Sequence, residues 1–314
     1  MLEEVEHWLS RRSWSVADRP PDRLAAAKRA GGTSVSVVLP ALDEEGTVGE
    51  IVAEIRRELM EKVPLVDELL VVDSGSTDRT AEVAAAAGAK VVHRDAILPR
   101  LPAVAGKGEV LWRSLLATSG DIVAFVDADL KEFSADFVSG IVGPLLTDPD
   151  VAFVKAMYDR PLAGADGQGG RVTELMARPL LNMHWPRLAG FVQPLGGEYA
   201  ARRSLLERLP FPVGYGVELG LLVDALHTVG LDALAQVDVG VRRHRHQDGQ
   251  ALGRMAAAIY RTAQVRLARG HLVRPELTQF VRGEHGFEPR THPVDTEERP
   301  PMADISEYAH RRVA

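Results

Sequence analysis

Two aspartates separated by one residue, Asp127 and Asp129, are the residues of this sequence best suited to chemistry. They lie at and just beyond the end of a predicted strand, 121–127, so we expect both carboxylates on one strand face at the edge of a sheet. Paired carboxylates suit a divalent cation, because Mg²⁺ and Mn²⁺ prefer oxygen ligands and commonly share them with substrate phosphates. The same short pattern also fits an ordinary turn, where aspartate is common.

Polar residues also follow two other predicted strands. The strand at 34–40 is followed by Asp43 and Glu44, and the strand at 68–73 by Ser74 and the Ser76-Thr77-Asp78 run. Three neighbouring strands that deliver polar groups to one rim favour a nucleotide-binding crevice. The first strand is followed neither by Gly-x-Gly-x-x-Gly nor by a Gly-Lys-Ser/Thr loop, so dinucleotide-binding and P-loop proteins lose their main support.

The elements that must position these groups alternate regularly. Apolar strands at 34–40, 68–73, 90–93 and 121–127 are separated by helices at 45–60, up to 87, and at 109–118. Strands that are apolar almost throughout indicate a parallel sheet covered on both faces. We therefore expect an α/β protein with four parts: an N-terminal helical extension (1–32), a doubly wound nucleotide-binding domain (33–130), a smaller α+β part (131–282) and a Pro-rich C-terminal tail (283–314).

Composition excludes several classes of function. The chain has 37 Lys and Arg residues against 44 Asp and Glu residues, a net charge of −7, so nucleic acid is not an expected partner. Cysteine is absent, which excludes disulfides, thiolate metal sites and a cysteine nucleophile. Neither an apolar run long enough to span a membrane nor a signal peptide is visible. We expect a soluble cytoplasmic protein without a membrane partner.

Three further residues stand at predicted helix starts. Lys107 lies between two glycines, where its ammonium and the helix amides are placed to meet a diphosphate, although a surface lysine in a loop fits too. Arg171 follows Gly170 at a helix start, where an arginine is more often simply solvated, but its charge opposes the helix dipole, which is a reason to expect an anionic ligand. Glu218 follows a Gly-Tyr-Gly turn and is a candidate site residue, although an acidic residue in the first turn of a helix is also common because it interacts favourably with the helix dipole.

The motifs resemble a known family. The segments 37–45 (VVLPALDEE), 72–78 (VDSGSTD) and 127–129 (DAD) are similar to the GT-A glycosyltransferase domain. A narrower resemblance, over roughly residues 8 to 302, is to the retaining glucosyl-3-phosphoglycerate and mannosyl-3-phosphoglycerate synthases. It is carried by the segments 106–109 (GKGE), 170–175 (GRVTEL), 177–181 (ARPLL), 214–218 (GYGVE) and 240–245 (GVRRHR).

That resemblance implies an activity and a cofactor. It implies transfer of mannose or glucose from GDP-mannose, GDP-glucose or UDP-glucose to 3-phosphoglycerate, with retention by front-face attack and without an enzyme-bound sugar. The product would be a compatible-solute or polysaccharide precursor. The resemblance also implies a divalent metal, Mg²⁺ with Mn²⁺ or Co²⁺ as alternatives, and a homodimer joined in part by the tail. A disordered tail on a monomer is the alternative.

The resemblance further implies roles for particular residues. The implied catalytic residues are Lys107, Asp129 and Glu218. The implied donor-binding residues are Pro40, Ala41, Leu42, Glu44, Ser74, Lys107, Asp127, Ala128, Tyr215 and Glu218. The implied acceptor-binding residues are Gly170, Arg171, Thr173 and His246. The implied metal ligands are Asp127, Asp129 and His244, although the basic run around His244 also fits a solvated edge.

Three positions depart from the pattern of the glucosyl enzymes. His246 and Asp43 stand where asparagine is expected, and Ala128 where serine is expected. Because these changes cluster near the donor crevice, we expect a mannosyl enzyme with relaxed donor choice. A sugar-1-phosphate nucleotidyltransferase would need a Gly-rich, Arg-containing loop in place of residues 40–43. A non-catalytic nucleotide-sugar sensor on the same fold would predict a broken metal site.

Overall fold

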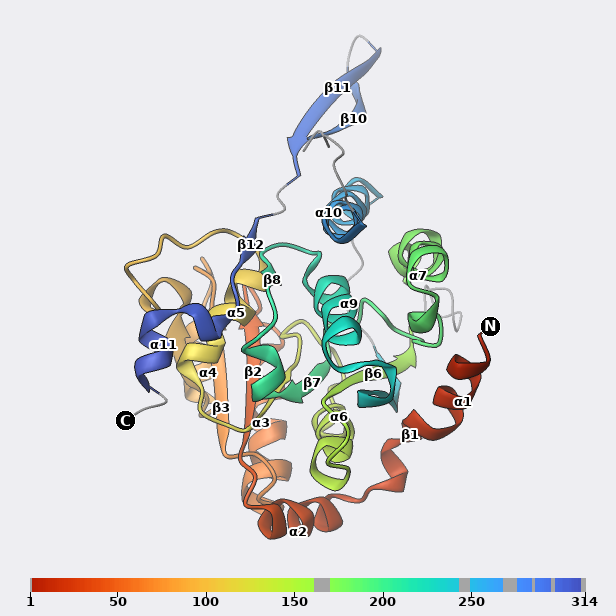
Figure 1. Ribbon diagram of the computed structural model, residues 1–314. Coiled ribbons are helices and arrows are strands. Elements are labelled where there is room, and N and C mark those ends of the chain that lie inside the picture. Colours follow the sequence, from red (N-terminus) through yellow and green to blue (C-terminus); the bar gives the residue numbers. More distant parts are fainter. Residues whose placement is uncertain are drawn as a thin grey trace.

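The protein is organised around one eight-stranded sheet with helices on both faces (Figure 1). The structure, a computed structural model, describes residues 2–160, 170–242, 249–267, 276–283, 286–294 and 297–311. The strands run across the sheet in the order β1 (Ser13–Ser15), β9 (Leu234–Val241), β6 (Phe153–Asp159), β7 (Tyr199–Arg202), β5 (Ile122–Phe125), β2 (Val35–Ala41), β3 (Glu68–Asp73) and β4 (Lys90–His93).

The predicted parallel unit is confirmed. Strand β2 pairs in parallel with β3 and β5, and β3 pairs in parallel with β4. Successive side chains alternate between the two faces, so Val37 and Leu39 enter one apolar core while Val38 enters the other. One core packs α2 (Pro21–Gly31), α3 (Val48–Arg56), α4 (Thr80–Ala86) and α6 (Asp136–Thr147). The other packs α1 (Glu3–Arg12), α5 (Lys107–Ala117), α7 (Arg178–His184), α9 (Val217–Val229) and α10 (Gly249–Leu267).

The sheet continues beyond the first α/β unit. Strand β7 is antiparallel to both β5 and β6, and β9 extends the sheet in parallel with β6. The N-terminal segment adds β1 at the edge, where Trp14 pairs with Val237. The predicted boundary at 130/131 therefore does not divide the sheet, and segment 1–32 supplies a strand as well as helices. That residues 33–130 bind the nucleotide sugar and residues 131–282 bind the acceptor stays a prediction.

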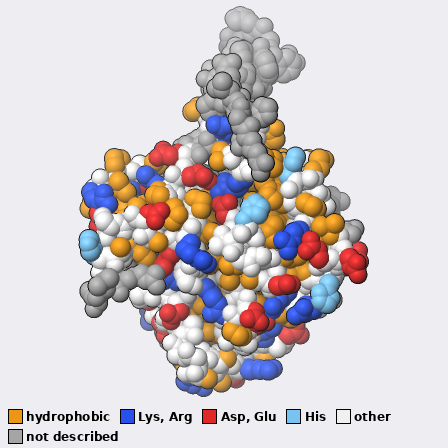
Figure 2. Space-filling view, in the orientation of Figure 1, with side chains coloured by type: hydrophobic (Ala, Val, Ile, Leu, Met, Phe, Trp, Pro, Cys, Tyr) orange, Lys and Arg blue, Asp and Glu red, His pale blue; other side chains and the backbone are white. Residues whose placement is uncertain are grey.

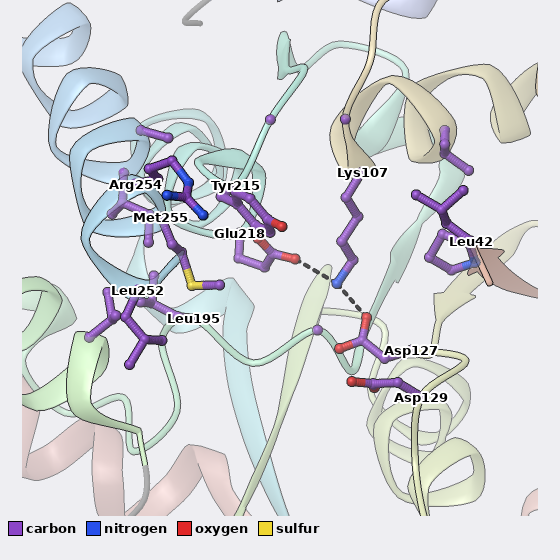
Figure 3. Close-up of a pocket in the computed structure, with 18 of the residues that line it drawn as sticks. Leu42, Lys107, Asp127, Asp129, Leu195, Tyr215, Glu218, Leu252, Arg254 and Met255 are labelled. Atoms are coloured by element: carbon purple, nitrogen blue, oxygen red, sulfur yellow. Dashed lines mark hydrogen bonds and ion pairs between the residues drawn. The ribbon is translucent and has the colours of Figure 1, made fainter. Parts of the chain in front are cut away.

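Strand β5 ends at Phe125, two residues before the predicted end. Beyond it the Thr47 hydroxyl donates to the carbonyl oxygen of Ala128 at 2.6 Å, which holds the chain in a turn. Asp127 and Asp129 therefore lie in the turn after β5, and the expectation that they share a strand face was wrong. They remain neighbours at the carboxyl edge of the sheet (Figure 3).

Two predicted helices contain π-helical turns. The helix expected at 45–60 starts at Val48 and continues after α3 as η2 (Arg57–Lys62). The helix expected from Arg171 contains η4 (Thr173–Ala177) before α7. Pro179 has no N–H to donate along an α-helical ladder, so the wider turn precedes it. The remaining short helices are η1 (Val16–Asp18), η3 (Arg94–Ala96), η5 (Pro186–Leu188), α8 (Arg203–Leu206) and η6 (Leu231–Ala233).

The C-terminal region forms a hairpin and then returns to the body. Strands β10 (Glu276–Gly283) and β11 (Gly286–Pro293) are antiparallel and lie beyond α10 (Figure 1). After them, β12 (Glu298–Arg299) pairs with β8 (Phe211–Pro212), and η7 (Met302–Asp304) and α11 (Ser306–Arg311) follow. Met302, Ile305 and Tyr308 are buried in the core to which α5 belongs, and η7 contacts α5. The alternative of a disordered tail is therefore wrong for residues 297–311.

Charges of both signs cover the surface. On the face seen in Figure 2, basic and acidic side chains are interspersed, as the net charge of −7 leads one to expect. Among the described residues, none of the helices combines the length and the apolar character that crossing a membrane requires.

Candidate active site

A cavity of about 940 Å³ lies where strands β2, β3 and β5 end and helices α5 and α9 begin (Figure 3). It brings together every predicted site residue that the structure describes: Pro40, Ala41, Leu42, Glu44, Ser74, Lys107, Asp127, Ala128, Asp129, Gly170, Arg171, Thr173, Tyr215 and Glu218. His244 and His246 lie outside the described residues. Carboxyl ends of parallel strands are the expected place for a ligand in such a sheet.

Lys107 joins two of the predicted carboxylates. Its ammonium is bound to Asp127 and lies 2.8 Å from Oε1 of Glu218 (Figure 3). Burial works against a charged lysine here, but the two carboxylates outweigh it and raise the pKa of Lys107 well above its usual value. Lys107 is therefore a cation in the cavity, held between Asp127 in the turn after β5 and Glu218 in the first turn of α9.

The start of α5 is set by close packing. Gly106 has a φ of +137°, which a residue with a side chain rarely adopts, and a Cβ at Gly108 would overlap the carbonyl oxygen of Pro212. The backbone N–H of Glu109 donates to Val213 O at 3.2 Å. The Gly-Lys-Gly pattern thus lets the first turn of α5 lie directly against the end of β8 and place Lys107 in the cavity.

Arg242 is a site residue that the sequence did not single out. Its Nη2 donates to Oδ2 of Asp127 at 2.6 Å, and the arginine side chain is only 4% exposed. Burial raises the pKa of a carboxyl, but Lys107 and Arg242 together hold the pKa of Asp127 well below its usual range. Gly197 packs against this carboxylate so closely that a Cβ there would overlap it. Asp127 is therefore an ionised, tightly held group.

Asp129 has a different environment. Its Oδ1 is buried and has no hydrogen-bond partner among the residues that the structure describes, and Arg242 Nη2 lies 3.5 Å from it. Burial and the neighbouring carboxylate of Asp127 raise the pKa of Asp129. A buried carboxylate oxygen without a donor suits a metal ligand. Within the described residues no group of three or more metal-binding side chains forms, and the predicted third ligand, His244, lies outside them.

Behind Arg242 lies a buried polar layer. Glu198 is fully buried and accepts from Arg242 Nε at 2.9 Å and from the Tyr158 hydroxyl at 2.7 Å. The Tyr158 hydroxyl in turn accepts from Arg160 Nη2 at 2.9 Å. A glutamate inside the apolar 196–202 segment was the one sequence signal for this layer, since a buried charge needs a partner. The partners themselves come from distant strands.

The predicted donor side of the cavity is formed by two loops that are bound to each other. The Ser74 N–H donates to Ala41 O at 2.9 Å, and the Thr77 N–H donates to Oδ1 of Asp43 at 2.7 Å. Asp43 has a φ of +56°, a conformation that asparagine and aspartate tolerate better than other residues with side chains. Aspartate and asparagine both supply this carbonyl-type acceptor, so the loop geometry explains why aspartate fits at position 43.

The predicted acceptor side is rich in arginine. Gly170 adopts a φ of +76° before the exposed Arg171, and Thr173 is buried. The following turn is anchored by Arg178, which pairs with Glu174 at 2.9 Å and donates to Val192 O at 2.8 Å. Besides Arg242, the cavity is lined by three more arginines absent from the predicted site, namely Arg94, Arg160 and Arg254. Such a lining favours an anionic ligand.

Comparison with known proteins agrees with this geometry. Residues 36–207 match the model of the family described as Glycosyl transferase family 2. The chain is 51% identical to glucosyl-3-phosphoglycerate synthase of Mycolicibacterium smegmatis, over 96% of this chain and 97% of the relative. It is 47% identical to the corresponding enzyme of Mycobacterium tuberculosis, over 93% and 90%.

Two solved structures are also similar. Mannosyl-3-phosphoglycerate synthase from Rubrobacter xylanophilus has a TM-score of 0.89 and 42% identity, over 95% of this chain and 97% of that one. Glucosyl-3-phosphoglycerate synthase from Mycobacterium tuberculosis, in complex with Mn²⁺, UDP and phosphoglyceric acid, has a TM-score of 0.82 and 47% identity, over 93% and 95%. These likenesses, carried on a GT-A-type sheet with the predicted residues around one cavity, show that the chain belongs to the glucosyl-3-phosphoglycerate and mannosyl-3-phosphoglycerate synthase family of glycosyltransferases.

Proposed function

We propose that this protein transfers a hexose from a nucleoside diphosphate sugar to 3-phosphoglycerate, with retention at the anomeric carbon. One observation carries the proposal. The Lys107–Asp127–Glu218 cluster, suited to a sugar diphosphate, and Arg171 with Thr173, suited to a phosphorylated acid, line the same cavity. Relatives that cover nearly the whole chain are named for the same reaction class.

On the donor side, the residues at the ends of β2 and β3 bind the nucleotide and sugar. The 40–42 segment and Ser74 hold the nucleoside. The Glu218 carboxylate accepts hydrogen bonds from sugar hydroxyls, and the Tyr215 hydroxyl can donate to them or accept from them. Lys107 binds the diphosphate, where a fixed ammonium offsets the charge that develops as the bond to the sugar breaks. Its two carboxylate partners keep it oriented before the donor enters.

On the acceptor side, Arg171 and Thr173 hold 3-phosphoglycerate next to the anomeric carbon. A guanidinium binds phosphate or carboxylate through two parallel hydrogen bonds, which fixes orientation as well as charge. When the acceptor hydroxyl is held beside the anomeric carbon, the two reacting groups no longer have to meet by diffusion, so the step becomes effectively unimolecular. We assign His246 to the same role on the basis of the family pattern.

Asp127, Asp129 and His244 are the residues we propose as ligands of a divalent cation. The buried Oδ1 of Asp129, which none of the described residues binds by a hydrogen bond, supports this assignment. When bound, the cation supplies Lewis-acid stabilisation of the leaving diphosphate. Mn²⁺ and Mg²⁺ occur in solved structures of the Mycobacterium tuberculosis relative.

The similar proteins are named for different donor sugars. Relatives at 47–51% identity are named glucosyl enzymes, whereas a structural neighbour with a TM-score of 0.89 is named a mannosyl enzyme. Our expectation from the departures at Asp43, Ala128 and His246 is mannose with relaxed donor choice. Purified protein should be assayed with UDP-glucose, GDP-glucose, UDP-mannose and GDP-mannose against 3-phosphoglycerate. If the protein transfers a hexose from none of the four donors, the proposal is refuted. If it binds the nucleotide sugar without transferring the hexose, the non-catalytic sensor is favoured.

A further inference from the structure

Three helices that contribute to the cavity are linked, directly or through one neighbour, to one C-terminal segment, residues 297–311, which we call the C-terminal strap. Lys107 begins α5, Glu218 lies in the first turn of α9, and Met255 lines the cavity from α10. Strap residues 297–299 contact α5 and α10 directly, and they are linked to α9 through Arg266 and through β8. The strap itself does not line the cavity.

Arg299 binds the first turn of α5. Its Nε lies 2.6 Å from Oε2 of Glu109 and its Nη2 lies 3.0 Å from Oε1, so the pair is bidentate. Glu109 is fully buried two residues after Lys107, and its Oε1 also accepts from Arg113 Nε at 2.7 Å. The Arg299 guanidinium lies over the ring of Trp112, 5.4 Å from its centroid. Arg299 thereby closes a buried charge network at the helix that presents Lys107.

The strap also holds the segment that leads to Glu218. Strand β12 pairs with β8, with Arg299 opposite Phe211, and the Val213 N–H donates to Glu297 O at 3.1 Å. Val213 O accepts from the N–H of Glu109. Because β8 continues through the Gly-Tyr-Gly turn into α9, the strap touches both chain segments that flank the Lys107–Glu218 contact.

Glu298 extends these contacts to α10. Its Oε1 lies 2.8 Å from Arg266 Nη2, and Arg266 Nε donates to Oδ1 of Asp224 on α9 at 3.0 Å. Arg266 is largely buried, so water does not readily replace these partners. Adjacent strap residues thus connect α5, β8, α9 and α10 around the cavity.

We propose that Arg299 is a positioning residue for the transfer reaction. It sets the first turn of α5 against β8, and so fixes Lys107 relative to Glu218, 2.8 Å away. The kinetic part of this inference rests on the proposed function. A misplacement of about 1 Å in a catalytic group can cost on the order of 100-fold in rate, so loss of Arg299 is expected to act on catalysis although Arg299 touches no substrate.

The kinetic test compares Arg299→Ala, Arg299→Lys and a matched control, Arg100→Ala. Arg100 is exposed and binds Glu307 at the other end of the same strap. We expect Arg299→Ala to lower kcat by about 10- to 100-fold, with the KM for 3-phosphoglycerate within about twofold of wild type. Arg299→Lys should restore part of the rate, and Arg100→Ala should behave as wild type. If only the melting temperature falls, while kcat per folded molecule stays unchanged, the positioning role is overturned.

Hydrogen exchange provides a readout that needs no substrate. Arg299→Ala, or Arg299→Lys if the alanine variant does not fold, should speed amide exchange in peptides covering 107–113 and 211–218. Peptides covering β2 should exchange as in wild type. Unchanged exchange in both cavity segments overturns the inference. If the wild-type enzyme transfers no hexose, the proposed function fails and the exchange experiment alone decides the role of the strap.

Discussion

The Nε of Arg242 lies 2.9 Å from Oε1 of Glu198, and the same guanidinium reaches Oδ2 of Asp127 through Nη2 at 2.6 Å. Glu198 is therefore the counterion that holds Arg242 in the orientation in which it binds Asp127. Glu198 and Arg242 are both buried, so neither charge has access to bulk water. The consequences can be tested on stability and on the site.

Glu198→Ala should destabilise the protein by about 3–5 kcal/mol, because it leaves the buried guanidinium of Arg242 without one of its carboxylates. The free energy of unfolding, from urea titration followed by circular dichroism, measures this loss. Glu61→Ala is the control, since Glu61 forms an exposed pair with Arg56 and its loss should cost at most about 1 kcal/mol. Equal losses in the two variants would contradict the assigned role of Glu198.

Asp129→Ala should abolish most transfer while leaving the fold intact. The variant removes a hard oxygen ligand from the proposed metal site, and the charge stabilisation at stake is several kcal/mol, which corresponds to at least about 100-fold in kcat. Steady-state kinetics with added Mg²⁺, together with the melting temperature, provide the measurement. The control is Asp232→Ala, an exposed aspartate in η6. Full activity of Asp129→Ala, or of wild type in excess EDTA, would remove the metal assignment.

Arg171→Ala should raise the KM for 3-phosphoglycerate far more than the KM for the nucleotide sugar. A hydrogen bond to a charged group contributes about 1.5–3 kcal/mol, so we expect an increase of roughly 10- to 100-fold for the acceptor. Arg187→Ala, which removes an exposed arginine paired with Glu4, should leave both constants unchanged. Equal changes in the two KM values, or no change in either, mean that Arg171 does not bind the acceptor.

Lys155 should make stability rise with pH above about 8. Its Nζ is buried and donates to Gly196 O at 2.7 Å, and burial lowers the pKa of Lys155 to about 8. Between that value and the ordinary 10.5, the unfolded chain holds a proton that the folded chain has lost, so raising the pH favours the folded state. Below pH 8 this contribution is constant.

The measurement is the free energy of unfolding of wild type and Lys155→Met from pH 7 to pH 10. The stability of wild type minus that of the variant should stay level up to about pH 8 and then increase. Parallel curves across the whole range would show that Lys155 does not titrate with a lowered pKa.

The protein should form a homodimer, the commonest closed assembly and the one that the family resemblance implies. Light scattering on the full chain should give twice the 34.1 kDa of one chain at micromolar concentration. Truncation near Arg282 also removes Met302, Ile305 and Tyr308 from the core of the same chain. A gentler variant that deletes only the hairpin 276–293 therefore tests the tail's part in dimerisation. A monomeric mass of the full chain refutes the dimer.

Local patterns explain why the sequence predicted much of the fold. Between residues 34 and 130, apolar strands alternate along the chain with helices. This order predicted a parallel sheet covered on both faces, and the structure contains it. The Gly-Lys-Gly motif placed Lys107 at a helix start, as observed. Strand ends were less predictable. Strand β5 ends two residues before the predicted end, and the turn that follows it is bound by Thr47, more than seventy residues away along the chain, whose hydroxyl donates to the carbonyl oxygen of Ala128.

By itself the sequence determined the α/β class, because that depends on periodicity, and its short motifs indicated the family and a part of the residues that line the cavity. Only the tertiary structure showed that Arg242, Glu198 and Arg299 complete the surroundings of Asp127 and Lys107. Their contacts join strands, helices and a C-terminal segment that are distant in sequence, and an isolated arginine or glutamate carries no local pattern that names its partner. Burial decides such pairings, and burial exists only once the chain has folded.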